Sequence, residues 1–153
     1  MLETPHAVVG AAIAASVANP VIGLPLAFAS HFVLDKVPHW NPHLNTELKK
    51  HGKVSKNSSS IILADTGLAF LLSLLIASSA LPDTNRFIVI MLGAFAGILP
   101  DLVEAPYYFL KKRSDWIMRW IKFQKSIQVD TTLVPGLSTQ IITVMAALFW
   151  VFY

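Results

Sequence analysis

The sequence predicts an all-α membrane protein: a polytopic bundle of three spanning helices, an N-terminal re-entrant helical hairpin and an amphipathic helix at the membrane surface. The chain is 54% hydrophobic and only 14% charged, which is roughly half the charge of an average soluble domain. A chain of 153 residues cannot hide that much apolar surface in one core. The remaining charges gather between long apolar blocks, so we treat residues 1–153 as a single integral membrane domain.

Three apolar blocks have the length of a membrane-spanning helix. Residues 61–81, 87–109 and 133–153 each provide the roughly 20 residues that a helix needs to cross a hydrocarbon core of about 30 Å. Most lysines and arginines lie in residues 36–56 and 111–125, whereas the turn between the first two of these blocks holds only Arg86. An excess of cations marks cytoplasmic loops. We therefore expect a multi-pass protein of the cell membrane, with both basic loops in the cytoplasm and the C-terminus outside.

The first apolar block, residues 6–37, is about 30 residues long and is interrupted by NPVIGLP at its middle. Asn19, Pro20, Gly23 and Pro25 are helix stop and start signals. The block is either one long kinked helix, which would make a fourth span, or a hairpin with arms at 4–18 and 24–37 and a turn within 19–25. Each arm would be about 20 Å long. An arm of that length cannot span the bilayer, so the hairpin would have to be buried against the other helices.

Histidines and carboxylates interrupt these apolar blocks. An ionisable group inside a membrane costs at least about 2.5 kcal/mol, so each one is a functional candidate. The candidates are His6, His31, Asp35, His39, Asp65, Asp101 and Glu104. In one long helix, His6 would lie about 37 Å from His31. The hairpin instead returns His6 to the cytoplasmic face beside the others, and we favour it for that reason.

These side chains form a donor set that suits a metal ion. Imidazoles and carboxylates in this ratio fit Zn²⁺ or another first-row divalent ion, and the chain has no cysteine to supply a thiolate. His31 and Asp35 are four residues apart and so share one helical face. We expect His31, Asp35, Asp65 and Asp101 to share a metal ion, with His6 and His39 as further ligands at its edge. A hydrogen-bonded structural cluster and a proton relay are the alternatives.

Residues 115–128, DWIMRWIKFQKSIQ, interleave aromatic and aliphatic side chains with cations. This pattern predicts an amphipathic helix in the cytoplasmic interface; a helix in a soluble loop is the alternative. A site at headgroup level beside such a helix favours a membrane lipid as the partner. The net charge of only +3 and the grouping of the cations favour membrane orientation and not nucleic-acid binding. The oligomeric state stays open.

Three segments, TPHAVVGAAIA, SHFVLDKVPHW and GAFAGILPDLVE, resemble the predicted membrane-bound metal-dependent hydrolases of bacteria, a family distantly similar to the zinc-dependent phospholipases C. The marks of that family are an N-terminal histidine, an H-x-x-x-D followed by P-H, and a P-D at the end of an apolar helix. They map onto His6, His31, Asp35, His39 and Asp101. Where a further ligand is expected, the segment FQKSIQ carries no histidine.

The resemblance implies a hydrolase of the bacterial inner membrane that acts on a phospholipid or lipid phosphate at the cytoplasmic headgroup level. A bound ion would activate water, and Glu104 would accept the proton. The competing class is a non-enzymatic membrane protein whose polar cluster binds an ion, relays protons or holds a partner. The sequence contains no G-x-S-x-G, phosphate-binding glycine loop or dinucleotide motif that would indicate another chemistry.

Overall fold

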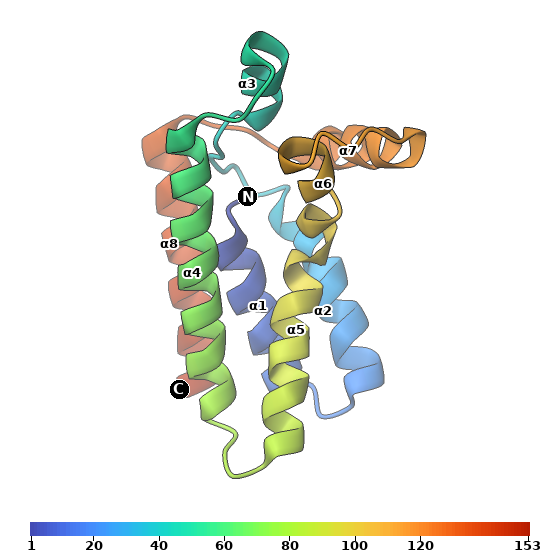
Figure 1. The fold of residues 1–153 in the computed structure, drawn as a ribbon. Helices are drawn as coiled ribbons and strands as arrows, with labels where there is room; N and C mark the ends of the chain where they lie inside the picture. Colours follow the sequence, from blue (N-terminus) through green and yellow to red (C-terminus); the bar gives the residue numbers. More distant parts are fainter.

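The computed structural model describes residues 1–153 as eight helices without a sheet (Figure 1). The helices are α1 (Glu3–Ser16), α2 (Pro20–Leu34), α3 (Leu44–His51), α4 (Lys56–Ser78), α5 (Thr84–Leu102), α6 (Ala105–Phe109), α7 (Asp115–Ile127) and α8 (Leu133–Phe152). The all-α class is confirmed. So are three long apolar helices, because α4, α5 and α8 are long and apolar enough to cross a membrane.

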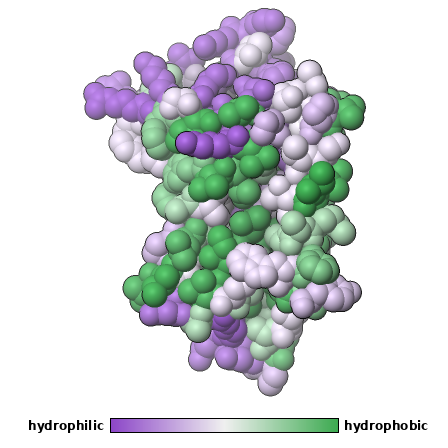
Figure 2. Space-filling model, turned by 180° about the vertical axis from the view of Figure 1, so that it is seen from behind, coloured by the Kyte–Doolittle hydropathy of each residue, from purple (hydrophilic) through white to green (hydrophobic).

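The bundle turns large apolar side chains outward. The exposed ones include Leu63, Phe70 and Leu71 on α4, Ile88 and Phe95 on α5, and Ile141, Ile142, Met145 and Phe149 on α8. Figure 2 shows apolar residues gathered over the middle of the molecule, with hydrophilic residues toward both ends. Exposing apolar surface to water costs about 25 cal/mol per Å², a cost that lipid tails remove. The surface therefore suits a multi-pass membrane protein.

The N-terminal block folds as two separate helices, α1 and α2, which run side by side in opposite directions (Figure 1). The turn covers residues 17–19 and so lies earlier than the predicted 19–25. Asn19 caps α2 by accepting a hydrogen bond of 2.9 Å from the amide of Val21. Pro20 occupies the first helical position, where no amide hydrogen is needed. The helix then continues through Pro25, which we had read as part of the turn.

Arg86, at the start of α5, closes the free end of α1. Its guanidinium donates hydrogen bonds to the carbonyl oxygens of Ala15, Val17 and Ala18. Carbonyls at the end of a helix have no partner within that helix, and a cation there also complements the helix dipole. Arg86, the one cation near the connection between α4 and α5, thus has a structural role.

Helix α1 lies at the centre of the bundle, in contact with α2, α4, α5 and α8. Glycines let the backbones of α1 and α5 approach each other closely, as small residues do in membrane helix pairs. A Cβ atom placed on Gly97 would overlap the carbonyl oxygen of His6, and one on Gly93 would overlap the side chain of Ala14. This contact between α1 and α5 fixes the position of His6.

We expect Gly97→Ala to lower the midpoint of thermal unfolding in detergent, measured by circular dichroism, because the backbone oxygen of His6 cannot move aside. Overpacking of this kind costs about 1–3 kcal/mol. Gly67→Ala is the matched control, since Gly67 also lies within an apolar helix but has no atom within 4 Å of its Cβ position. Its midpoint should stay the same or rise. Equal midpoints for the two variants would contradict close packing of α1 on α5.

Two further segments differ from the prediction. Residues 87–109 do not form one helix, because α5 ends at Leu102 and α6 begins at Ala105. Pro106 lies in the first turn of α6, and within a continuous helix it would remove a backbone hydrogen bond. The loop at 36–56 contains an unpredicted helix, α3.

The predicted amphipathic segment 115–128 is confirmed as a helix, α7, which lies across the end of the bundle (Figure 1).

Candidate metal centre

Five of the six predicted ligands come together near the end of the bundle that carries the N-terminus and α7. His6 lies on α1, His31 on the last turn of α2, Asp35 directly after α2, His39 in the next loop and Asp101 on the last turn of α5. The three imidazoles are 0% exposed, Asp35 is 1% exposed and Asp101 is 18% exposed. Four of these five groups are thus shielded from solvent, and only the Asp101 side is partly open.

The carboxylate of Asp35 faces three imidazoles. Its Oδ1 lies 3.3 Å from Nε2 of His6 and 3.8 Å from Nε2 of His39. Its Oδ2 lies 3.4 Å from Nε2 of His31. The amino group of Met1 also contacts Oδ1, at 2.7 Å. Asp35 is therefore the common neighbour of every histidine in the group.

The ring of His31 is held so that its Nε2 faces oxygen atoms. Its Nδ1 lies 2.8 Å from the carbonyl oxygen of Gly97; a carbonyl only accepts, so Nδ1 carries the hydrogen. In the neutral ring Nε2 then has a lone pair. Around Nε2 lie Oε1 of Gln124 at 3.1 Å, Oδ2 of Asp35 at 3.4 Å and Oδ1 of Asp101 at 3.6 Å. A lone pair and three acceptor oxygens repel one another unless a cation lies between them, either a proton on Nε2 or a metal ion.

The other two histidines have ring nitrogens without hydrogen-bond partners. His39 places Nδ1 2.8 Å from the carbonyl oxygen of Val37, and its Nε2 makes no hydrogen bond. Neither ring nitrogen of His6 makes a hydrogen bond, although the residue is fully buried. Buried polar groups without partners are rare. A backbone carbonyl on the far ring nitrogen, as in His31 and His39, is the usual support of a metal-ligating histidine.

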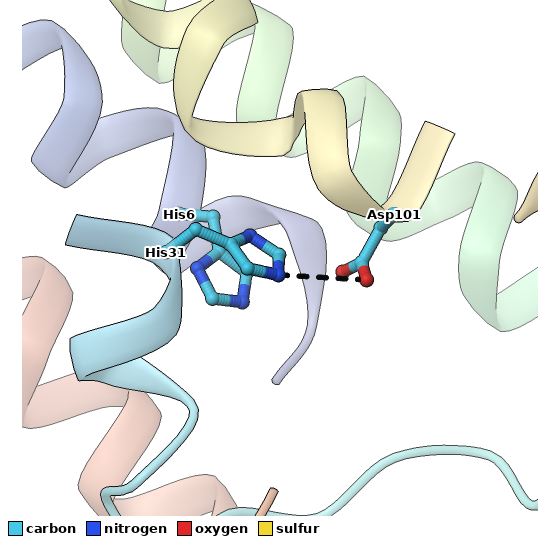
Figure 3. Close-up of side chains that lie close together, drawn as sticks. All are labelled: His6, His31 and Asp101. Carbon is cyan, nitrogen blue, oxygen red and sulfur yellow. Dashed lines mark ion pairs between the residues drawn. The ribbon is translucent and has the colours of Figure 1, made fainter. Parts of the chain in front are cut away.

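His6, His31 and Asp101 form a group of possible ligands (Figure 3). One ligand atom from each lies within 4.8 Å of the others, and the two rings stack with centroids 3.9 Å apart. Asp35 and His39 lie beside this group but are not members of it. Neighbouring ligands of a tetrahedral zinc ion lie about 3.4 Å apart when the bonds are about 2.1 Å long. Side-chain movements of somewhat more than about 1 Å would bring the three ligand atoms to that spacing. This buried His-His-Asp group can therefore bind a metal ion.

Asp65 has a different set of contacts. Its Oδ2 accepts hydrogen bonds from the backbone amides of Glu3 at 2.6 Å and Thr4 at 3.3 Å, and its Oδ1 accepts one from the Thr4 hydroxyl at 2.6 Å. Amides at the start of a helix have no partner within it, so Asp65 on α4 caps α1. The structure does not place Asp65 in the His6, His31 and Asp101 group.

Two glutamines that the sequence analysis overlooked reach the centre from α7 and the residue after it. Nε2 of Gln124 donates to Oδ1 of Asp101 at 3.1 Å and to Oε1 of Glu104 at 3.2 Å. Nε2 of Gln128 donates to Oδ2 of Asp35 at 3.3 Å. Both lie in FQKSIQ, the segment without a histidine. Their spacing of four residues on the apolar side of an amphipathic helix is the sequence signal that could have found them.

A cavity of about 310 Å³ lies beside Asp101. Its polar lining includes the carboxylates of Glu3, Asp65, Asp101 and Glu104. Burial, followed by the negative charge of Asp101, raises the pKa of Glu104 to about 7. The volume is that of a small ligand pocket. The cavity therefore leaves one side of Asp101 accessible while the three histidines stay enclosed.

No protein-family model, curated protein or solved structure matches the chain. A fold alone would not assign an activity in any case, because function depends on the site that a fold carries. The chemistry of the site must therefore be inferred from its side-chain geometry.

Proposed function

We propose that this chain is a membrane-embedded metalloenzyme in which His6, His31, Asp35 and Asp101 hold a divalent metal ion, and that it hydrolyses a phospholipid or lipid phosphate. The observation that carries the proposal is the Nε2 atom of His31, which faces three oxygens. A proton on that atom would satisfy His31 alone and would leave both ring nitrogens of His6 and Nε2 of His39 without partners. A metal ion would satisfy several of these atoms at once.

Charge and donor chemistry support the same ligand set. Asp35 and Asp101 together carry two negative charges when ionised. The Met1 amino group compensates part of this charge, and a divalent ion would compensate the rest in a buried place where an uncompensated charge is costly. Two imidazoles and two carboxylates suit zinc better than magnesium or calcium, which prefer oxygen ligands. His39 lies at the edge of the set, 3.8 Å from Asp35.

The placement in the membrane is part of the proposal. Helix α1 has 14 residues and so a length of about 21 Å, too short to span, and its neighbours α2, α4, α5 and α8 shield it from lipid. The N-terminus lies at the end that carries α3 and α7, and the C-terminus lies at the other end (Figure 1). We propose that α1 and α2 form a re-entrant hairpin. The cation-rich loops favour the cytoplasm as the location of the N-terminal end.

Catalysis is favoured over a purely structural ion because the centre is open on one side. Structural zinc sites are closed, whereas catalytic sites keep a position for water or substrate. Asp101 faces the cavity, and Glu104 is tied to it through Gln124. A carboxylate with a pKa of about 7 is suited to accept a proton from water near neutral pH. The resemblance to the predicted membrane-bound metal-dependent hydrolases points to the same reaction class.

Hydrolysis can be tested with the zinc-loaded chain in vesicles of phosphatidylethanolamine, phosphatidylglycerol or phosphatidic acid, by measuring the phosphate compounds released. We expect at least one lipid to be cleaved. Glu104→Gln should lower the rate about 100-fold without changing the zinc content. Glu47→Gln is the control, because Glu47 contacts Ser55 and Ser58 near α3 instead of the centre. Zinc-loaded protein that cleaves none of the lipids would overturn the hydrolase and favour an ion-binding protein.

A further inference from the structure

Helix α7 presents three different faces. One points into the protein and includes Ile121 and Gln124, which are both buried. A second is aromatic, with Trp116 61% exposed and Phe123 48% exposed. The third is basic and exposed and includes Arg119, Lys122 and Lys125. A helix with one buried, one aromatic and one basic face is typical of an amphipathic helix at the membrane interface, in contact with protein, lipid and water.

The buried face of α7 holds several parts of the metal centre. Gln124 contacts Asp101, Glu104 and Nε2 of His31. One turn earlier, Nε1 of Trp120 donates a hydrogen bond of 3.0 Å to the carbonyl oxygen of Pro100, the residue before Asp101. Any shift of α7 would therefore move the supports of two proposed ligands.

Helix α7 has few fully buried apolar contacts with the rest of the protein, although Phe32 of α2 packs against its aromatic face. The apolar cluster beneath it consists of Leu48, Tyr107 and Ile121 and is separate from the main core, which lies among α1, α4, α5 and α8. Segments with few buried apolar contacts open at low free-energy cost. A second surface that α7 binds would therefore have a large influence on its position.

The exposed faces of α7 fit the surface of an anionic membrane. Tryptophan is enriched where lipid tails meet water, and lysines and arginines near the membrane are attracted to anionic headgroups. The aromatic face continues onto α2, because Phe32 packs against both Trp120 and Phe123 with ring centroids 6.2 and 5.8 Å apart. Figure 1 shows α7 crossing the end of the bundle at a steep angle to α2 and α5. An anionic lipid surface is thus the partner that the position and chemistry of α7 favour.

We propose that α7 couples the metal centre to the membrane surface, with Gln124 as the positioning residue. When the aromatic face is seated in lipid, Gln124 stands among His31, Asp101 and Glu104 and holds them for the ion. When α7 moves away from the bundle, Gln124 loses its contacts with His31, Asp101 and Glu104 at once, and the affinity of the site for metal falls. This inference rests on the proposed function, because it concerns the regulation of the same site.

The test measures binding of cobalt(II), by its visible absorption, to the full chain in phosphatidylglycerol or phosphatidylcholine nanodiscs. We expect tighter binding in phosphatidylglycerol. In those discs, Gln124→Leu and the double variant Trp116→Ser/Phe123→Ser should each weaken binding about 10-fold, as loss of a group that supports a ligand does. Phe149→Ser/Trp150→Ser, which removes exposed aromatics from α8, is the control and should bind as the parent chain does.

Combining the substitutions tests whether the coupling passes through Gln124. In the Gln124→Leu background, Trp116→Ser/Phe123→Ser should cause little further loss, because residues that act through one another are not additive. Fully additive losses, or equal affinities in all variants and both lipids, would overturn the coupling while leaving the metal centre intact. A parent chain that binds no cobalt in either lipid would overturn the metal centre as well. The lipid comparison needs no substitution, so misfolding of a variant cannot hide the result.

Discussion

Asp35→Ala is expected to lower the free energy of unfolding by about 3–5 kcal/mol, the usual loss when one partner of a buried charged group is removed. The carboxylate is 1% exposed and contacts His6, His31 and Gln128. Its removal leaves the Met1 amino group and the Gln128 amide without this acceptor and removes one of the four proposed metal ligands. The measurement is chemical unfolding in detergent, followed by tryptophan fluorescence, with and without zinc.

Two comparisons sharpen this prediction. Asp115→Ala is the control, because Asp115 is exposed at the start of α7 and should change stability little. Asp35→Asn keeps the shape of the side chain but not its charge, so we expect it to fold better than Asp35→Ala and still to lose the added stability that zinc gives the parent chain. If Asp35→Ala and Asp115→Ala unfold alike, Asp35 is not the hub of a buried cluster.

The second large effect is expected from His31→Ala, which removes the ring at the middle of the group. Loss of an outer support lowers metal affinity about 10- to 100-fold, and loss of a ligand itself should lower it by at least about 100-fold. Zinc affinity can be measured by competition with a chromogenic chelator in detergent. His43→Ala and His51→Ala are matched controls, because both histidines are exposed. Equal affinities in His31→Ala and the two controls would remove His31 from the site.

Much of the fold could be predicted because a membrane imposes length and composition on what crosses it. The three long helices follow from apolar blocks of spanning length. The hairpin was predicted because one long helix would place His6 at the opposite face of the membrane, away from the other histidines and carboxylates. Local detail was less accessible: whether Pro25 ends a helix or lies within one depends on the cap that Asn19 provides and on how Gly23 packs against Val17. Both contacts are local, but Asn19, Pro20, Gly23 and Pro25 are all helix stop or start signals, so the sequence does not show which of them ends the turn.

The metal centre was predictable to the extent that its members are ionisable. His31 and Asp35 are recognised by their spacing, and Asp101 by its cost inside an apolar helix. A carboxylate at Asp65 costs the same free energy inside an apolar helix. Only the structure shows that the backbone amides of α1 compensate this cost by donating hydrogen bonds to it. Gln124 carries no such energetic signal, because burying a neutral amide in an amphipathic helix costs little that a sequence can reveal; only its spacing of four residues from Gln128 marks it.

X-ray absorption at the zinc edge, on the unmodified chain loaded with zinc in lipid, tests the proposed centre most directly. The proposed ligands predict an inner shell of nitrogen and oxygen atoms at about 2.0–2.2 Å, together with the outer-shell scattering of two imidazole rings from His6 and His31. The same spectrum from His43→Ala should be identical. A chain that retains no zinc, or zinc surrounded by oxygen alone without imidazole scattering, would contradict a metal centre built on these two histidines.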